Sequence, residues 1–198
     1  MSAVPAVVSG EKITARKLDV GCGSRKLPGF LGVDNMVSPE VDVIHDLNVY
    51  PWPFPNDSFS HIVCRHSLSH LDDIVAVIEE LHRIAAPGGV IEIVAPHFSS
   101  DNHFTDVTHR RAFGYRSMDY FCVNRDCLYR YSEKAVFKLV EVRISFLQAK
   151  AFDVKKPNPF RWIGLEWLAN KAPRIYEHFF AFIIRANEVY FRLEPIKS

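Results

Sequence analysis

Residues 18–34 read LDVGCGSRKLPGFLGVD: a short apolar run, a turn with two glycines, and a second apolar run that ends in an acid. This pattern is typical of a nucleotide-binding unit, because glycine lets the backbone turn sharply and lets a ligand approach the amide groups. In a dinucleotide fold the acid follows the glycines by about 20 residues. Here Asp34 lies only 13 positions after Gly21, and Lys26 stands where the third glycine would be. The stretch therefore predicts a site for a ligand that needs no long helix facing a pyrophosphate.

The first half of the chain alternates short, β-branched apolar runs with turns. These runs are bounded by Gly, Pro, Asp or Asn, as buried strands are, and they cover residues 17–20, 29–33, 41–46, 59–64 and 89–95. Between the last two runs, apolar residues recur at helical spacing at Ile74, Ile78, Leu81 and Ala85. We expect Pro87-Gly88-Gly89 to end this helix. A strand, a helix and a strand with short links form a parallel crossover, so the first half is α/β.

The second half has a different pattern. Residues 96–126 are polar, aromatic and rich in histidine without sustained periodicity, which predicts a long functional loop with one short helix near residues 117–121. Residues 134–152 and 188–196 alternate as strands, and we expect them to form an antiparallel pair. Residues 158–183 predict one or two helices interrupted at Pro173.

Composition limits the class of protein. The chain has 198 residues, of which 48% are hydrophobic and 13% aromatic, enough for one domain with a substantial core. Twenty-four basic and 23 acidic side chains give a formal charge of +1, which argues against a dominant nucleic-acid or anionic-membrane surface but leaves room for a local patch. The four cysteines lack paired zinc spacing and predict isolated thiols.

The first residues do not resemble a signal peptide, and charges interrupt the apolar stretch 175–193, so we expect a cytoplasmic protein with no transmembrane segment.

Acids end two of the apolar runs. Asp34 follows the second run, Asp46 ends the third, and an aromatic-proline turn leads into the fourth. Because the carboxyl ends of consecutive parallel strands meet at one edge of a sheet, these acids are expected to converge on one crevice.

Five ordered motifs carry a resemblance to a known family: LDVGCG, GVD, HDLN, PWPFPNDSFSHIVCRHSLSHLDD and LHRIAAPGGVIEIVAPH. Over residues 17–98 the chain resembles class I S-adenosylmethionine-dependent methyltransferases, most closely the methyltransferase type 11 group. The resemblance implies a Rossmann-like α/β sandwich with a mostly parallel seven-stranded sheet, an antiparallel C-terminal strand and a shortened first helix. It also implies one domain over residues 1–198, with a cofactor-binding half (17–98), an acceptor-side loop (97–130) and a part that closes the sheet (131–198).

The same resemblance assigns residues to S-adenosyl-L-methionine. The glycine turn would contact the methionine moiety. The acid after the second strand would bind the ribose, and the acid after the third strand would contact the adenine. The end of the fourth strand would lie near the methyl-bearing end of the cofactor. In chain order these residues are Asp19, Gly21, Cys22, Gly23, Asp34, Asn35, Asp46, Leu47, Arg65 and His66.

The histidine-rich segment supplies the candidate catalytic residues. In the family fold it begins over the transferred methyl group, and a neutral histidine suits removal of a proton from an acceptor hydroxyl. We predict His97 and His109 as candidate bases and Asp106 as an orienting partner; hydrogen bonds to loop backbone are an equally good interpretation of each histidine. His97, His103 and His109 are six residues apart, which matches neither a helix face nor a strand, so we predict no metal site. Arg110 and Arg111 could hold an anionic acceptor or form a solvated edge.

The aromatic residues Trp162, Trp167, Tyr176, Phe179 and Phe180 fall in an apolar helical region. Core packing is the default interpretation, and a dimer face or a surface for a lipid substrate is the minority one.

The leading hypothesis is methyl transfer to a small-molecule or glycan-type acceptor by a monomer or homodimer. A non-catalytic binding or regulatory subunit is the first alternative, since residues 24–28 form a short loop and LSH at residues 68–70 replaces the family's usual LEH. A metal-dependent hydrolase that uses the histidine-rich segment is the second.

Overall fold

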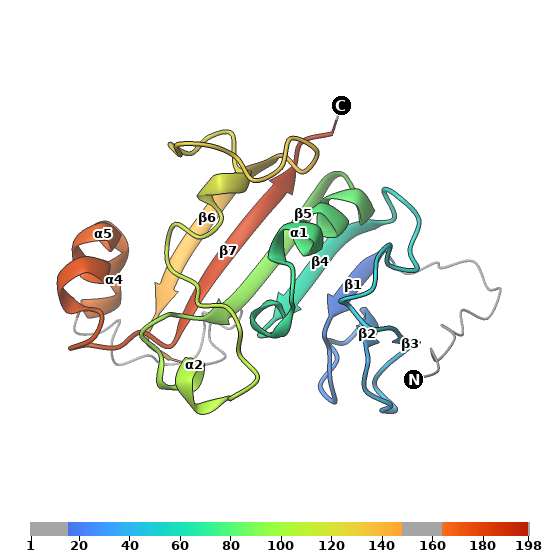
Figure 1. The fold of residues 1–198 in the computed structure, drawn as a ribbon, viewed down its shortest axis with the longest axis horizontal. Coiled ribbons are helices and arrows are strands. Elements are labelled where there is room, and N and C mark those ends of the chain that lie inside the picture. Colours follow the sequence, from blue (N-terminus) through green and yellow to red (C-terminus); the bar gives the residue numbers. More distant parts are fainter. Residues whose placement is uncertain (1–15, 148–163, 198) are drawn as a thin grey trace.

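The computed structural model describes residues 16–147 and 164–197, and these form one seven-stranded sheet (Figure 1). The strand order is β3-β2-β1-β4-β5-β7-β6. Strands β1 to β5 are mutually parallel where they pair, and β7 is antiparallel to both of its neighbours. This confirms the predicted Rossmann-like methyltransferase sheet. The strands are β1 (Lys17–Val20), β2 (Leu31–Asp34), β3 (Val43–Ile44), β4 (Phe59–Arg65), β5 (Ala85–Pro96), β6 (Phe137–Ser145) and β7 (Glu188–Pro195).

Helix α1 (Ile74–Ile84) connects β4 to β5. It begins where the Asp73 carboxylate accepts hydrogen bonds from the backbone N–H groups of Val75 and Ala76, a standard N-cap. Its apolar side packs on the sheet, with Ile78 and Leu81 fully buried. The helix ends before the predicted stop at Pro87: Ala85 is already extended and starts β5, although its N–H still bonds the carbonyl of Leu81.

Turns replace the expected shortened first helix between β1 and β2. The N–H groups of Gly21 and Cys22 both reach the carbonyl of Val33, which folds the chain straight back alongside β2. The buried Asp19 carboxylate accepts from the N–H of Leu27 and fixes the rest of the link. The link between β1 and β2 is short, and these hydrogen bonds hold its backbone in turns. It therefore forms no helix.

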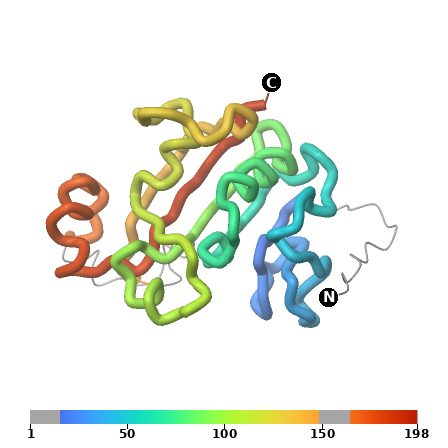
Figure 2. Tube along the Cα trace, viewed as in Figure 1, coloured from blue at the N-terminus to red at the C-terminus, as the bar shows by residue number. Residues whose placement is uncertain are grey.

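The segment from β5 to β6 contains α2 (Asp101–Thr105), which the sequence did not predict, and a 3-10 turn, η2 (Asp119–Phe121), inside the predicted helical stretch. Figure 2 traces this segment from the end of β5 to the start of β6. Beyond β6, α4 (Leu165–Lys171) and α5 (Pro173–Ile175) are separated at Pro173 as predicted, and a π-helical turn, η3 (Tyr176–Phe180), follows. Residues 148–152 of the predicted strand, and Trp162, lie outside the described residues.

Two apolar clusters hold these parts together. The main cluster joins α1 to the sheet through fully buried side chains such as Ile62, Ile78 and Phe191. A second cluster joins Ile144 of β6 to Tyr176, so the helical C-terminal region packs against the edge of the sheet. The four cysteines carry free thiols. Within residues 16–147 and 164–197, no helix is long and apolar enough to cross a membrane.

Candidate active site

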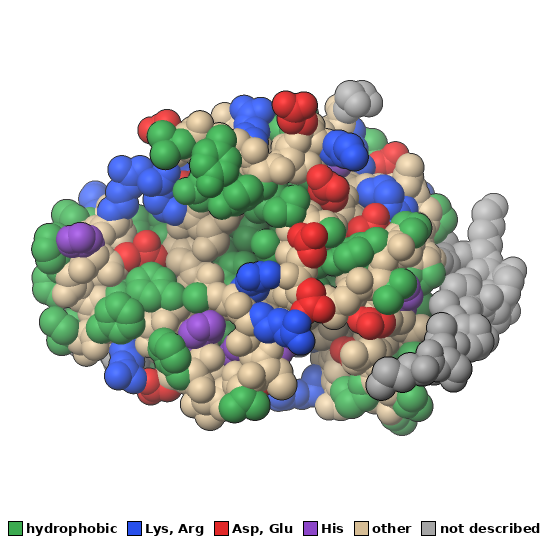
Figure 3. Space-filling view, in the orientation of Figure 1, with side chains coloured by type: hydrophobic (Ala, Val, Ile, Leu, Met, Phe, Trp, Pro, Cys, Tyr) green, Lys and Arg blue, Asp and Glu red, His purple; other side chains and the backbone are tan. Residues whose placement is uncertain are grey.

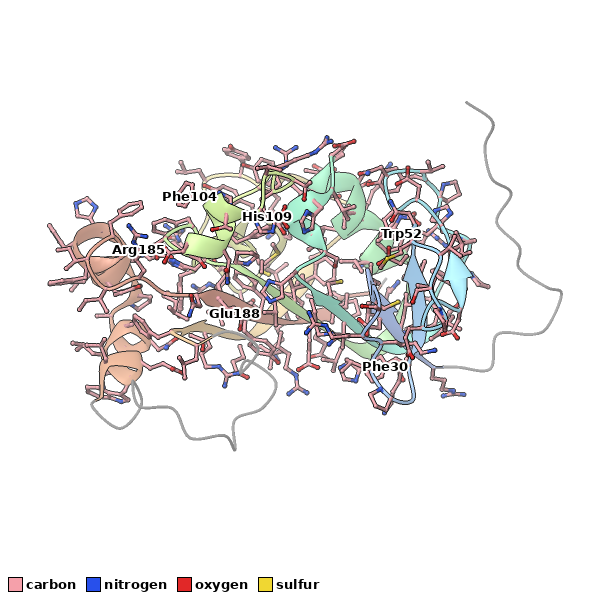
Figure 4. All side chains as sticks on the ribbon, turned by 90° about the horizontal axis from the view of Figure 1, so that it is seen from below. Phe30, Trp52, Phe104, His109, Arg185 and Glu188 are labelled. Atoms are coloured by element: carbon pink, nitrogen blue, oxygen red, sulfur yellow. The ribbon has the colours of Figure 1, made fainter. Side chains whose placement is uncertain are left out.

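A cavity of about 1060 Å³ opens at the carboxyl ends of β1, β2 and β4. This is at the upper end of the roughly 300–1,000 Å³ that ligand sites occupy. Figure 4 views the molecule from below, with Glu188 and His109 near the middle of the view. Nine of the ten predicted cofactor residues line the cavity, namely Gly21, Cys22, Gly23, Asp34, Asn35, Asp46, Leu47, Arg65 and His66. The tenth, Asp19, is completely buried and contacts Arg65.

The glycine turn forms one wall of the cavity. Gly21 has φ +68°, and a Cβ atom there would lie 2.3 Å from the Cβ of Ser67. Gly23 has φ +54°, and its N–H donates to Asp34 Oδ2 over 2.9 Å. Both positions therefore require glycine conformations, and Gly21 also requires the absence of a side chain.

Asp34 is placed to bind a diol. Its Oδ1 accepts from the N–H of Met36 and its Oδ2 from the N–H of Gly23, so the carboxylate has a fixed orientation. The side chain is half-buried and lines the cavity. Because each carboxylate oxygen has two lone pairs, both oxygens can still accept a hydroxyl hydrogen bond from a ribose.

An ion pair joins the fully buried Asp19 to Arg65, whose side chain is 26% exposed. Arg65 Nη2 donates to Asp19 Oδ2 over 2.6 Å and also to the carbonyl of Arg25. Asp19 Oδ1, Arg65 Nε and Ser67 Oγ are buried and have no hydrogen-bond partner among the described residues. Unsatisfied buried polar atoms are costly. An acceptor, a donor and a hydroxyl in one place match the ammonium and carboxylate of an amino acid, so the site fits the methionine end of S-adenosylmethionine.

His66 contacts an acid that the sequence analysis did not identify. His66 has φ +57°, and its Nε2 lies 2.9 Å from Oε1 of Glu188, the first residue of β7. Glu188 is fully buried and lines the cavity. Only the antiparallel pairing of β7 with β5 brings these two residues together, and no local pattern in the sequence marks it.

A cluster of His70, Asp106 and His109 lies at the same end of the molecule. His70 ends the 3-10 turn η1 (Leu68–His70) after β4 and lines the cavity. Its ring centroid is 4.6 Å from that of His109, and His109 Nε2 is 4.0 Å from Asp106 Oδ2. One ligand atom from each of the three residues lies within 4.8 Å of the others, so the cluster could also hold a metal ion.

Hydrogen bonds assign the tautomers of the two histidines. The Thr108 hydroxyl is 2.6 Å from Asp106 Oδ1 and 2.9 Å from His70 Nδ1. Its single proton goes to the carboxylate, which makes His70 Nδ1–H the donor to Thr108. His109 Nδ1 lies 3.2 Å from the carbonyl of His103, which can only accept. Both neutral rings therefore carry their lone pair on Nε2.

Burial favours the neutral forms of His70 and His103. Burial lowers the pKa of His70 below its usual value, and the positive charge that His109 can carry lowers it further. Burial and His109 lower the pKa of His103 in the same way, and its ring stacks on His109. A neutral imidazole is the form that accepts a proton.

The other predicted residues of the loop lie elsewhere. His97 is fully buried, with Nδ1 2.8 Å from Ser99 Oγ and Nε2 3.2 Å from Glu177 Oε1, and it is not among the cavity-lining residues. Arg110 and Arg111 are exposed and contact Asp72, through its carboxylate and its carbonyl respectively. The structure thus brings His109 and Asp106 together with His70; of these three only His70 lines the cavity, and His97 instead packs against Tyr176 of the second apolar cluster.

The sheet order and the cavity at the ends of its parallel strands define a class I methyltransferase. A model of the family described as "Methyltransferase domain" matches residues 8–142, more than half of the chain. The protein belongs to this family of methyltransferase domains.

Known proteins similar to the chain agree with this assignment. A demethylmenaquinone methyltransferase of Lysinibacillus sphaericus is 34% identical over 53 residues, which are 27% of this chain and 22% of that protein. One of Geobacillus stearothermophilus is 28% identical over 81 residues, 41% of this chain and 30% of that protein. The chain thus matches less than a third of the length of these relatives.

Among solved structures, a SAM-dependent methyltransferase from Archaeoglobus fulgidus shares the fold with a TM-score of 0.52 at 14% identity, covering 90% of this chain and 85% of that one. An S-adenosylmethionine-dependent methyltransferase from Mesorhizobium loti gives 0.50 at 14%, covering 90% of each chain.

Proposed function

We propose that the enzyme methylates a hydroxyl group of a small-molecule or glycan-type acceptor, and that His109 removes the hydroxyl proton. The observation that carries the proposal is the His70–Asp106–His109 cluster: the His70 ring lines the cofactor cavity, and the His109 ring packs against it with the two ring centroids 4.6 Å apart. S-adenosylmethionine supplies an electrophilic methyl group on a sulfonium. The protein then has to align the acceptor oxygen, exclude water and accept the proton.

The cofactor-binding residues would fix the position of the methyl group. Asp19, Arg65 and Ser67 offer the unpartnered atoms for the amino-acid end, and Asp34 offers both oxygens to the ribose. Asp46 and Leu47 line the adenine side of the cavity. These contacts place the methionine end beneath the glycine turn, next to the wall formed by Ser67 and His70.

The histidine cluster would complete the acceptor side. His109 Nε2 takes the proton, and the carboxylate of Asp106, 4.0 Å away, stabilises the imidazolium that forms. The lowered pKa of His70 keeps that ring neutral, so it does not repel the new positive charge. His97 was an equal candidate from sequence, but its burial against Ser99 and Glu177 favours a role in holding the loop.

The test is methyl transfer from labelled cofactor to a panel of hydroxyl acceptors: phenols, sugars and the demethylated quinone headgroup that the relatives' name suggests. His109→Gln should reduce kcat by about 100-fold or more, the typical contribution of a general base. Binding of S-adenosylhomocysteine should stay unchanged. The matched control is His178→Gln, since His178 is exposed and outside the cavity. Full activity in His109→Gln would contradict the proposal.

A divalent cation held by the same three residues is the competing candidate, because their ligand atoms lie within 4.8 Å of one another. Metal analysis of the purified protein separates the two. We expect less than about a tenth of an equivalent; a stoichiometric ion lost in both His70→Gln and Asp106→Asn would assign the cluster to a metal.

A further inference from the structure

The C-terminal helical region carries a concentration of exposed large apolar side chains. In α4, α5, η3 and the turn that follows, six such side chains are more than half exposed, from 56% for Ile175 to 77% for Ile183. Figure 3 shows apolar side chains gathered at the end of the molecule that α4 and α5 form. We call this surface the apolar end face, and it consists of Trp167, Leu168, Ile175, Phe179, Phe182 and Ile183.

These side chains are not displaced core residues. The inward positions of the same segment are already filled by Ala169, Tyr176 and Ala181, which are buried against Phe146 and Ile144. The Tyr176 hydroxyl also donates to the carbonyl of Ile184. The segment is therefore packed on its inner side and apolar on its outer side. Core packing, the default expectation for Trp167, Phe179 and Phe180, is wrong for all three and right for Tyr176.

The exposed charged side chains of α4 and α5 are Lys171 and Arg174, both basic. Two exposed acids of neighbouring elements are each paired with an arginine, Glu141 with Arg143 and Asp101 with Arg185. Lys171, Arg174 and His178 are exposed, and the Lys171 ammonium lies 5.4 Å from the ring centre of Trp167. The two acids of the segment point inward. Glu166 is only 3% exposed, and Glu177 accepts from the N–H of Tyr115 and contacts His97.

A second copy of the protein and a lipid surface are the two candidates to cover the apolar end face, and the charge pattern distinguishes between them. In a two-fold dimer the same patch meets itself, so Lys171 and Arg174 would face their own copies, while Glu141, the exposed acid beside Lys171, already pairs with Arg143. An anionic lipid surface supplies the missing negative charge, and Trp and Phe side chains insert at the boundary between headgroups and acyl chains. A patch of aromatic and aliphatic side chains interspersed with basic ones fits such a surface.

We propose that the apolar end face docks the enzyme on membranes that contain anionic lipids. Trp167, Phe179 and Ile183 enter the interface, and Lys171 and Arg174 contact lipid phosphates. The contact is peripheral, and it is independent of the acceptor that the active site uses.

The experiment is co-sedimentation of the full chain with vesicles, without cofactor or acceptor. One set is pure phosphatidylcholine and the other contains about 30% phosphatidylglycerol, each at about 0.05 and 0.5 M NaCl, where screening differs strongly. We expect at least about fivefold more bound protein on the anionic vesicles at low salt, and most of this excess lost at high salt.

Two variants and a control test the residues. Phe179→Ser/Ile183→Ser and Lys171→Glu/Arg174→Glu should each lower the vesicle partition coefficient by about tenfold or more. Leu128→Ser, at an exposed apolar residue outside the patch, should bind as the wild type does. Calorimetry with S-adenosylhomocysteine verifies that each variant is folded.

Equal binding to both vesicle types, or unchanged binding of both double variants, would overturn the proposal. A dimer in light scattering that dissociates in Phe179→Ser/Ile183→Ser would also overturn it, because it assigns the face to a second copy. Failure of the hydroxyl-methylation proposal would leave these results unaffected, since the assay contains no acceptor.

Discussion

Gly21 lies at the end of β1 with the Ser67 side chain directly against it. The sequence predicted the turn, because two glycines flank Cys22 after an apolar run. It could not predict the partner, since Ser67 lies after a different strand. The contact joins two segments of the cavity wall, the turn after β1 and the residues after β4, and Ser67 Oγ is buried without a hydrogen-bond partner among the described residues.

Gly21→Ala tests this contact. The new Cβ would meet the Ser67 Cβ at 2.3 Å in a backbone with φ +68°, so we expect at least about tenfold weaker binding of S-adenosylhomocysteine and about 1–3 kcal/mol lower stability. Gly29→Ala is the matched control: it has φ +78° but no neighbour within 4 Å of its Cβ. It should lose stability through backbone strain alone and bind the ligand normally. Equal binding losses in both variants would contradict a specific role for the contact at Gly21.

Some residues of the cavity could be predicted from the sequence and others could not. The difference depends on whether a local pattern or a distant contact brings the residue to the cavity. Asp34 and Asp46 were predictable because Asp34 ends β2 and Asp46 follows β3 by two residues, and strand ends converge in a parallel sheet. Glu188 and His70 were not, because Glu188 reaches the cavity through the antiparallel return of β7 and His70 through a single 3-10 turn. His97 was predicted from its position after β5, with a role in loop hydrogen bonding as an equal interpretation; its contacts with Glu177 and Tyr176 favour the second interpretation.

At the scale of elements, α1 is the crossover that sets β4 and β5 parallel and so places Arg65 and His66 at the cavity. The sequence predicted its existence and its apolar face, because the 3.6-residue periodicity is local. Its end was placed too late, because pairing of Phe59 with Ala85 draws the chain into β5 before the Pro-Gly-Gly turn. The link between β1 and β2 shows the same limit, since its missing helix depends on contacts with Asp19 and Val33.

Asp73→Ala tests how the helix begins. Loss of the two hydrogen bonds to the Val75 and Ala76 N–H groups should lower the free energy of unfolding by about 0.5–2 kcal/mol. Urea denaturation is the measurement. The neighbouring Asp72→Ala removes an exposed carboxylate that pairs with Arg110, and it should cost less than about 1 kcal/mol. An Asp72 variant as unstable as the Asp73 variant would argue against the cap.

At the scale of the whole molecule, the sequence predicts the parallel half of the fold better than the antiparallel half. The parallel half follows from short strands and local links. The antiparallel half depends on pairing of β7 with both β5 and β6, which are far apart in sequence, and on a long loop that packs through tertiary contacts. The exposed apolar end face belongs to this second half, and apolar periodicity alone could not distinguish it from core.

Stability of the whole molecule should fall as the solution becomes mildly acidic. Burial lowers the pKa values of His70, His82 and His103 below the usual 6.5, so these groups bind protons more readily in the unfolded chain. Stability therefore decreases as pH falls below about 6.5 and levels off once the pH is below the lowered values. Urea denaturation between about pH 7.5 and 5 measures this. His82→Gln, which keeps a donor for the Ile196 carbonyl, should show a shallower dependence; an unchanged slope would exclude His82 as a contributor.

Calorimetry with S-adenosylhomocysteine on the wild type, Asp34→Ala and the control Asp126→Ala tests the cofactor site most directly. Asp34 lines the cavity, accepts from the Gly23 N–H and is the proposed ligand of the ribose, whereas Asp126 is exposed and outside the cavity. We predict binding to the wild type and to Asp126→Ala, and at least about tenfold weaker binding to Asp34→Ala, the loss of two hydrogen bonds to hydroxyls. Absence of binding to the wild type at millimolar ligand, or equal affinity in all three proteins, would contradict this account of the site.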